Sequence, residues 1–328
     1  MTVFLFVLAL SAGLLLMAKG GDIFVDAAAK TARLLRVPPL LIGATIVSVG
    51  TTLPELLTSL TAMVRGVTSS SPEQLQAFTD VAVGNAVGSM VCNIGLIAAA
   101  GMLLCPYRAG GKAFAAKGLF LLALCAILPL FASSGGISRA EGIALLLFFL
   151  LFLAINIAEA RRKPPLPPSD APAGEPLSAK ARVFLALSLI FGAVFVAAGA
   201  IFTVESVSAL CSRLGVPQRI LSVTVVALGT SLPELVTAII SARKGEGELS
   251  LGNILGANAL NGTLILGLSA CVAGGLTLDD VTRRYTLFFA LALTALLVFP
   301  VLLFRRTSRL QGLALAALYA AAMYFSCS

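Results

Sequence analysis

The sequence contains no histidine and no tryptophan, and only 12% of its residues are charged. Without histidine, His-based catalytic triads, imidazole metal sites and imidazole proton relays are excluded. The six cysteines lie mostly in apolar segments without CxxC spacing, so we interpret them as small hydrophobic residues and predict no disulfide framework. Soluble domains carry about 25% charged residues. Since this chain carries half of that and is 59% hydrophobic, we predict an integral membrane protein.

The apolar segments are long and unbroken, which favours helices over barrel strands, where apolar and polar residues alternate. A helix needs about 20 apolar residues to cross the hydrocarbon core. We therefore predict an all-α membrane protein with ten transmembrane helices, at 2–18, 38–64, 78–104, 114–131, 140–159, 182–202, 217–242, 248–274, 286–304 and 309–326. The charged segment between the first two is predicted to be a helical extension or an interfacial helix. Residues 2–18 lack a basic leading region and a clear cleavage site, so we expect a retained span.

A Pro-rich polar stretch at 161–181 is predicted to be a linker between a first five-helix repeat (1–160) and a second (182–328). Of the 23 basic residues, 17 belong to the connections after odd-numbered spans. Because cytoplasmic connections carry an excess of Lys and Arg, we expect a cytoplasmic linker, extracytoplasmic termini and a location in the cell (cytoplasmic) membrane. We therefore interpret the basic residues behind the net charge of +8 as signals that set the orientation in the membrane, and no nucleic-acid partner is expected.

One stretch occurs twice. Residues 35–58 (LRVPPLLIGATIVSVGTTLPELLT) and 214–237 (LGVPQRILSVTVVALGTSLPELVT) align at a constant offset of 179, with twelve of 24 positions identical. Each half of the chain is predicted to contain five spans, which is an odd number. The second half therefore enters the membrane from the opposite side, and the second copy crosses it in the opposite direction to the first. This predicts an inverted-topology repeat, which allows one site to face either side in turn.

A second element is also duplicated, at an offset of 168: GNAVGSMVCN at 84–93 and GNILGANALN at 252–261. Residues four apart in a helix share one face, so each copy forms a polar stripe. The stripes consist of Asn85, Ser89 and Asn93 in one copy and Asn253, Ala257 and Asn261 in the other. Their amides are either oxygen donors for an ion or only ties between helices.

Each copy of the duplicated stretch contains a proline, Pro54 or Pro233, that removes a backbone N–H, so we expect the second and seventh helices to break near Gly50–Thr51 and Gly229–Thr230. Freed carbonyls in a membrane need partners. Two carboxylates and four hydroxyls lie at these breaks: Glu55, Glu234, Thr51, Thr52, Thr230 and Ser231. With the stripe amides, this set of hard oxygen donors suits Ca2+ or Na+.

Two carboxylates neutralise one Ca2+, and Na+ ions or protons could hold the same oxygens in its place. An empty, ionised pair would be costly at low dielectric, which favours crossing only when the site is loaded. These features predict exchange. The remaining acidic residues near span ends are interpreted as solvated: Asp80, Glu141, Glu159, Glu205, Asp279 and Asp280.

With the paired motifs GTTLPE/GTSLPE and GNAVGSMVCN/GNILGANALN, the sequence resembles the sodium/calcium exchanger family of the cation/calcium antiporter superfamily, in its small prokaryotic form. The resemblance implies that Ca2+ and Na+ share Glu55 and Glu234, and that spans one and six slide as a gate. It also implies further oxygen ligands from these positions: the carbonyls of Ser48, Thr51, Ala227 and Thr230 and the side chain of Ser89. No resident cofactor, no enzymatic activity and no obligatory protein partner are expected, only transported Ca2+ and Na+ and the lipid bilayer.

Two positions depart from the family pattern. Ala257 replaces a family serine, so one flanking Na+ site lacks a hydroxyl, the stoichiometry is open, and a Ca2+/H+ exchanger is the alternative function. Asn261 stands where potassium-dependent relatives carry aspartate, which implies K+ independence. Two other classes are disfavoured. An intramembrane hydrolase would need a GxGD, HExxH or paired-aspartate motif, and a passive channel has less need of an inverted repeat.

Overall fold

The structure is a computed structural model. It describes residues 3–35, 37–69, 71–161, 179–213 and 227–327. The first half contains α1 (Val3–Leu35), α2 (Pro39–Ile42), η1 (Gly43–Val47), α3 (Ser48–Thr68), α4 (Pro72–Cys92), η2 (Asn93–Ala98), α5 (Ala99–Leu104), α6 (Gly111–Phe131), η3 (Ala132–Ser134), β1 (Gly136–Ser138) and α7 (Arg139–Arg161). The second contains α8 (Ala179–Arg213), α10 (Ala227–Thr230), α11 (Leu232–Arg243), α12 (Gly247–Ala259), η5 (Leu260–Ile265), α13 (Leu266–Ala273), β2 (Gly275–Thr277), η6 (Thr282–Thr286), α14 (Leu287–Phe304) and α15 (Arg309–Cys327).

The chain is an all-helical membrane protein. Eight helical segments in its described part are long and apolar enough to cross a membrane, and they coincide with eight of the predicted spans. The predicted span 309–326 is the helix α15, and the predicted span 217–242 begins outside the described residues. The count of ten therefore stays a prediction. The same holds for the linker predicted at 161–181, because residues 162–178 also lie outside the described part.

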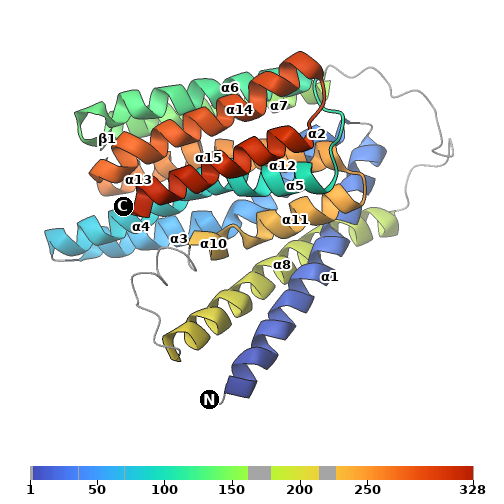
Figure 1. The fold of residues 1–328 in the computed structure, drawn as a ribbon, viewed down its shortest axis with the longest axis horizontal. Helices are drawn as coiled ribbons and strands as arrows, with labels where there is room; N and C mark the ends of the chain where they lie inside the picture. The colour runs from blue at the N-terminus through green and yellow to red at the C-terminus, as the bar shows by residue number, and fades with distance from the viewer. Residues whose placement is uncertain (1–2, 36, 70, 162–178, 214–226, 328) are drawn as a thin grey trace.

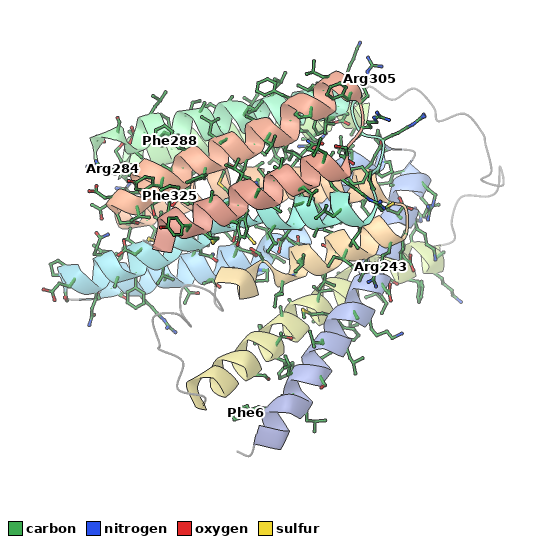
Figure 2. All side chains as sticks on the ribbon, viewed as in Figure 1. Phe6, Arg243, Arg284, Phe288, Arg305 and Phe325 are labelled. Carbon is green, nitrogen blue, oxygen red and sulfur yellow. The ribbon has the colours of Figure 1, made fainter. Side chains whose placement is uncertain are left out.

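Most helices run side by side in one bundle, whereas α1 and α8 form a pair that diverges from it (Figure 1). The connections α5–α6, α11–α12 and α14–α15 lie at one end of the bundle, and α3–α4, α6–α7 and α13–α14 lie at the other (Figure 1). At the second end, β1 pairs antiparallel with β2. Arg243 and Arg305 mark the first end and Arg284 the second, while Phe288 and Phe325 project from an outer face (Figure 2). Both phenylalanines are exposed, as side chains that face lipid would be.

The pair α1 and α8 packs antiparallel through small residues. A side-chain carbon added at Gly13 would lie 2.9 Å from the Gly199 carbonyl, and one added at Gly20 would lie 2.7 Å from Phe195 Cβ. Such glycines allow two membrane helices to approach closely. The prediction of a helical extension after the first span is confirmed, since α1 continues to Leu35.

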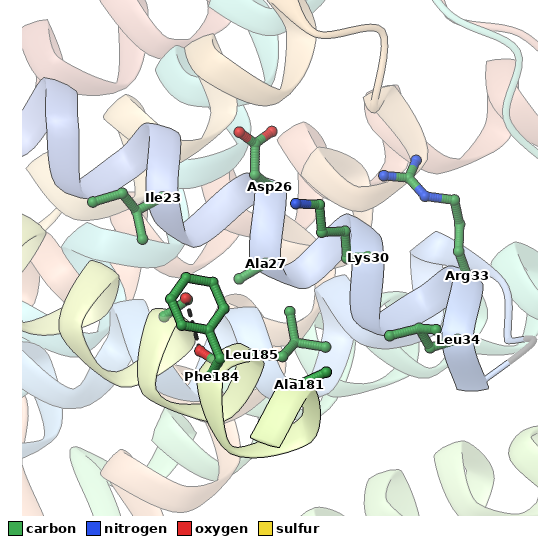
Figure 3. Close-up of a pocket in the computed structure, with 10 residues that line it drawn as sticks. Ile23, Asp26, Ala27, Lys30, Arg33, Leu34, Ala181, Phe184 and Leu185 are labelled. Atoms are coloured by element: carbon green, nitrogen blue, oxygen red, sulfur yellow. Dashed lines mark hydrogen bonds between the residues drawn. The ribbon is translucent and has the colours of Figure 1, made fainter. Parts of the chain in front are cut away.

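Beyond this contact, α1 and α8 border a groove of about 660 Å³, drawn in Figure 3. Apolar side chains such as Ile23, Leu34 and Leu185 line most of it, with Lys30 among them. The helices α1 and α8 are thus in close contact near Gly13 and Gly20, and they are separated by the groove nearer the C-terminal end of α1.

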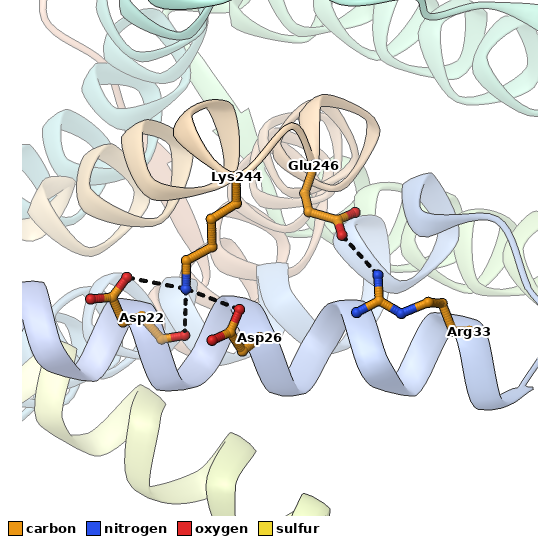
Figure 4. A network of polar contacts seen from close by, with 5 residues as sticks. All are labelled: Asp22, Asp26, Arg33, Lys244 and Glu246. Carbon is orange, nitrogen blue, oxygen red and sulfur yellow. Dashed lines mark hydrogen bonds and ion pairs between the residues drawn. The ribbon is translucent and has the colours of Figure 1, made fainter. Parts of the chain in front are cut away.

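Ion pairs hold α1 to the turn between α11 and α12 (Figure 4). Lys244 Nζ lies 3.1 Å from Asp22 Oδ1 and 2.9 Å from Asp26 Oδ1, and it donates to the Asp22 carbonyl at 3.2 Å. Arg33 pairs with Glu246 at 3.1 Å. Partial burial alone would lower the pKa of Lys244, but the hydrogen bonds and charges of Asp26 and Asp22 outweigh it and raise that pKa above its usual value.

A buried ion pair joins α6 to α7. Lys117 is fully buried and contacts Glu159, whose side chain is only 16% exposed. The interpretation of Glu159 as a solvated residue near a span end was therefore wrong, because its carboxylate neutralises a buried ammonium group.

The predicted helix breaks differ between the two copies. The break expected at Gly50–Thr51 is absent: α3 runs continuously through Pro54, and the irregularity lies earlier, in the π-helical turn η1. A proline inside a membrane helix removes one hydrogen bond, which such helices tolerate. In the second copy, Ser231 (φ −89°, ψ 4°) separates α10 from α11. Pro233 therefore occupies the first turn of a helix, where an N–H is not needed.

Glycines of the second motif bring α12 against the segment from α2 to α3. A carbon added at Gly252 would lie 2.2 Å from the Leu40 carbonyl, and one added at Gly256 would lie 2.5 Å from Ser48 Oγ. Only glycine permits these approaches, which place α12 of the second half next to α3 of the first. The motif helices of the two halves thus meet in the protein interior.

Candidate ion-binding site

Glu55 on α3 and Glu234 on α11 lie together in the interior, and both are fully buried. Their carboxyl groups are close enough to interact electrostatically. Thr52, on the helix that carries Glu55, donates its hydroxyl to Glu234 Oε1 at 3.3 Å. The structure therefore brings together the two carboxylates that the duplicated stretch singled out.

Three of the four carboxylate oxygens, Glu55 Oε1 and Oε2 and Glu234 Oε2, have no hydrogen-bond partner among the described residues. Buried polar atoms in proteins are nearly always hydrogen-bonded. Two buried acids with free acceptor oxygens are costly side by side, unless a cation or protons neutralise them. This arrangement fits a site for a cation that prefers oxygen ligands.

Buried hydroxyls surround the two acids. Thr51 Oγ1 lies 3.2 Å from both the Val47 carbonyl and Asn253 Oδ1, and Thr51 also interacts with the Glu234 side chain. Ser231 donates to Ser89 Oγ at 3.2 Å, which joins α4 to the turn before α11. The first-motif threonines, the two serines and both glutamates thus lie in one buried cluster.

The remaining predicted ligands are at Ser48, Thr230 and Ala227. Ser48 is fully buried, and its carbonyl, the atom predicted as a ligand, lies 3.5 Å from Thr51 Oγ1. Thr230 is half-buried and lines a groove of about 540 Å³ between α3, α8 and α10. The same groove borders Gly50 and Pro54 and extends to Glu205. The backbone of Ala227 begins α10, and its side chain lies outside the described part.

The asparagines of the polar stripes are of two kinds: some hydrogen-bond one helix to another, and some keep side-chain atoms without a partner among the described residues. Asn85 donates to the Glu55 carbonyl at 3.0 Å and to Ser59 Oγ at 2.9 Å. Asn253 donates to Thr237 Oγ1 at 3.2 Å. These two asparagines therefore hold the helices that carry the glutamates, through partners that the motif comparison does not reveal.

Asn93 and Asn261 are asparagines of the second kind. Both are fully buried, and unpartnered atoms remain on each: Oδ1 of Asn93 and both Oδ1 and Nδ2 of Asn261. Asn93 begins the π-helical turn η2, and Asn261 lies in η5, the corresponding turn of the other half. Such turns are frequent at functional sites.

The sequence interpretation missed Asn258. This residue is fully buried on α12, accepts a hydrogen bond from Asn93 at 2.9 Å and donates to the Met90 carbonyl at 3.0 Å. Asn258 lies inside the second motif, but the aligned position of the first motif is Met90. A comparison that seeks recurring polar residues therefore passes over it.

Comparisons with known proteins show the family of the chain. A family model described as sodium/calcium exchanger protein matches residues 5–158 and 184–328. The chain is 32% identical over 308 residues to the putative antiporter CaxA of Alkalimonas amylolytica, covering 92% of each protein. It is 29% identical over 350 residues to the sodium/calcium exchanger MaX1 of Methanosarcina acetivorans, covering 94% of this chain and 95% of the relative. It also resembles a solved structure of the sodium-calcium exchanger NCX_Mj soaked with Na+ and Sr2+, with a TM-score of 0.83 and 27% identity over 98% of this chain and 99% of that one.

Proposed function

Because the chain belongs to the sodium/calcium exchanger family, we propose that it exchanges Ca2+ for Na+ at one site built on Glu55 and Glu234. It is a multi-pass membrane protein and a cation/calcium antiporter, and its family and fold are those of a secondary transporter rather than an enzyme. One observation supports the specific site: two glutamates from different halves are buried together, and three of their four oxygens lack hydrogen-bond partners among the described residues.

The two carboxylates would balance the charge of one Ca2+, and neutral oxygens would complete its coordination. The proposed neutral ligands are the side chains of Thr51, Thr52, Ser231, Ser89, Asn93 and Asn261 and the carbonyls of Ser48, Thr51, Ala227 and Thr230. Na+ ions would occupy the same carboxylates, so Ca2+ and Na+ exclude each other. Ca2+ and Na+ exclude each other because two carboxylates cannot neutralise the charges of a bound Ca2+ and of bound Na+ ions at the same time.

Alternating access would come from α1 and α8. These helices pack on each other through glycines and diverge from the bundle that holds the glutamates, which suits a pair that slides as a unit (Figure 1). The groove between α3, α8 and α10 reaches Thr230 and offers a route toward the site. The antiparallel contact of α1 with α8 supports the inverted-topology repeat.

We place the protein in the cytoplasmic membrane, with both termini extracytoplasmic and the 161–181 linker cytoplasmic, because the connections alternate between two ends and 17 of 23 basic residues belong to one set. Ca2+ and Na+ are its cargo, and the bilayer is its surroundings. The proposal needs no resident cofactor and no obligatory protein partner.

Purified protein in proteoliposomes tests this function. We expect Ca2+ uptake to require an opposing Na+ gradient and to ignore an equal K+ gradient. Ca2+ uptake that does not depend on the Na+ gradient would contradict coupling to Na+. The matched control is the Glu55→Gln/Glu234→Gln double variant, which should show no uptake under any gradient.

A second candidate, Ca2+/H+ exchange, is favoured by Ala257. This residue is fully buried and occupies the position of Ser89, whose hydroxyl contacts Ser231. The second half therefore lacks one hydroxyl that could hold Na+. In the same liposomes, uptake driven by a pH gradient without Na+ would establish this candidate.

A further inference from the structure

The two buried asparagines at the ends of the motifs differ in their surroundings. Asn93 donates through Nδ2 to Asn258 Oδ1 at 2.9 Å, and its Oδ1 has no partner in the part of the chain that the structure describes. Asn261 has neither end of its amide hydrogen-bonded among the described residues. The two positions correspond at an offset of 168, so the difference does not come from the asparagines themselves.

The orientation of Asn93 follows from a backbone carbonyl. The Met90 carbonyl can only accept, so Asn258 must turn its Nδ2 toward it, and this bond is 3.0 Å long. Asn258 then presents Oδ1 to its neighbour, and only the Nδ2 of Asn93 can donate to that oxygen. The carbonyl oxygen of Asn93 is thereby left as the free end of the chain of hydrogen bonds.

Asn261 has no such chain, because the counterpart of Asn258 is Met90. A thioether is a weak acceptor and donates nothing, so it cannot orient an amide. The Met90 side chain packs against Gly262, the residue that follows Asn261: a carbon added at Gly262 would lie 3.1 Å from Met90 Cε and 3.2 Å from its sulfur. The Met90 carbonyl thus orients Asn258 and, through it, Asn93, while the Met90 side chain packs against the residue next to Asn261 in the sequence.

We propose that Asn258 is a positioning residue that fixes the side-chain oxygen of Asn93 as a constant cation ligand, while Asn261 remains an adaptable one. This inference rests on the proposed function and adds a division of labour within the site. Asn93 offers oxygen in every state. Asn261 can turn its oxygen toward a cation or its Nδ2 toward a glutamate, where the amide stabilises negative charge when less positive charge is bound.

The division favours Ca2+ over Na+ at the Asn93 side. An amide that is free to turn removes its oxygen from the ion for part of the time, and the attraction lost is greater for a divalent ion than for a monovalent one. Loss of Asn258 should therefore weaken Ca2+ binding more than Na+ binding.

A double-mutant cycle tests the role of Asn258. Ca2+ binding to the full-length protein in detergent is measured by isothermal titration, in choline chloride and then in rising NaCl. We expect Asn258→Leu to weaken Ca2+ binding about tenfold, and to do so less than about twofold when Asn93 is already Ala. Equal losses in both backgrounds would overturn the inference, because Asn258 would then act on the fold rather than through Asn93.

Asn156→Leu is the matched control. Asn156 is a buried asparagine of α7, a helix that contributes none of the proposed ligands, and it donates to the Phe152 carbonyl at 2.8 Å. Its Ca2+ affinity should equal that of the wild type. Circular dichroism melts establish that each variant is folded.

Met90→Asn tests the same idea without removing Asn258. The new amide would lie beside Asn261 as Asn258 lies beside Asn93, so we expect tighter Ca2+ binding that disappears when Asn261 is replaced by Ala. Unchanged affinity would contradict an adaptable Asn261. Wild-type protein that binds no Ca2+, or binds it without Na+ competition, would instead remove the proposed function, so the two failures are distinguishable.

Discussion

The hydroxyl of Thr52 lies 3.3 Å from Oε1 of Glu234, so a side chain of one half of the molecule contacts the carboxylate of the other. Thr51 makes a second crossing contact, at 3.2 Å from Asn253 Oδ1. These contacts mean that neither half contains a complete site. A movement that separates the halves would break the Thr52–Glu234 contact and part the two glutamates, which couples the geometry of the proposed site to conformation.

Replacing either glutamate by glutamine should abolish Ca2+ transport. Each change removes one of the two charges that face the cation. A unit charge pair at about 4 Å and an effective dielectric of 20 contributes roughly 4 kcal/mol, and a divalent ion doubles this attraction, so we expect a loss in Ca2+ affinity of more than about a thousandfold. Isothermal titration of Glu55→Gln and Glu234→Gln checks this, with Glu73→Gln, at the exposed start of α4, as the control. Wild-type Ca2+ affinity in either site variant would refute the shared site.

Ala257→Ser should restore the hydroxyl that the second half lacks. We expect Na+ to compete with Ca2+ at a severalfold lower concentration or with a steeper dependence, since the aligned Ser89 offers such an oxygen beside Ser231. Ca2+ titrations at increasing NaCl measure both properties. Ala259→Ser, also fully buried on α12 but part of the hydrophobic core, is the control. An unchanged Na+ dependence in Ala257→Ser would discount that position.

The sequence could predict which polar residues meet because the pattern recurs: Glu55, Glu234, Thr52 and Ser231 all lie in the duplicated stretch, and the structure places them together. It could not predict the path of the backbone. A proline has the same local effect in both copies, but tertiary packing keeps the first helix continuous, whereas in the second copy the turn at Ser231 precedes Pro233.

The supporting contacts were also beyond the sequence. Asn258 was missed because its aligned residue is Met90, and its role depends on a backbone carbonyl from the other half. Likewise, nothing in the stripes distinguishes Asn85, which ties α4 to the Glu55 carbonyl, from Asn93, which keeps a free oxygen. Such differences arise from three-dimensional neighbours that residue spacing does not encode.

Lys244→Gln should loosen α1 at neutral pH but have little effect in strong alkali. The folded-state pKa of Lys244 lies above its usual value of about 10.4, so its contribution to stability is complete below that pH and is lost as the pH rises through the folded-state pKa. Its two partly exposed ion pairs contribute about 1 kcal/mol or less each. Thermal melts from pH 7 upward should show a wild-type advantage that shrinks above roughly pH 10. Lys112→Gln, at the exposed start of α6, is the control, and a pH-independent difference would contradict the ion-pair explanation.

Gly84 and Gly252 occupy the same position of the second motif, yet alanine should have opposite effects at them. At Gly252 the added carbon would lie 2.2 Å from the Leu40 carbonyl, so α12 must move away from α2. Overpacking of this kind costs about 1–3 kcal/mol or more. At Gly84 nothing lies within 4 Å, and alanine in an exposed helix stabilises by roughly 0.5–1 kcal/mol relative to glycine.

The two variants are therefore matched controls for each other, because motif, residue type and substitution are identical. Melting temperatures in detergent should fall for Gly252→Ala and hold or rise for Gly84→Ala. Since Gly252 contacts the segment that leads into α3, its variant should also lose Ca2+ affinity, because displacement of α12 shifts Asn253 away from Thr51. Equal melting temperatures for both variants would show that the close approach of α12 to α2 does not hold the two halves together.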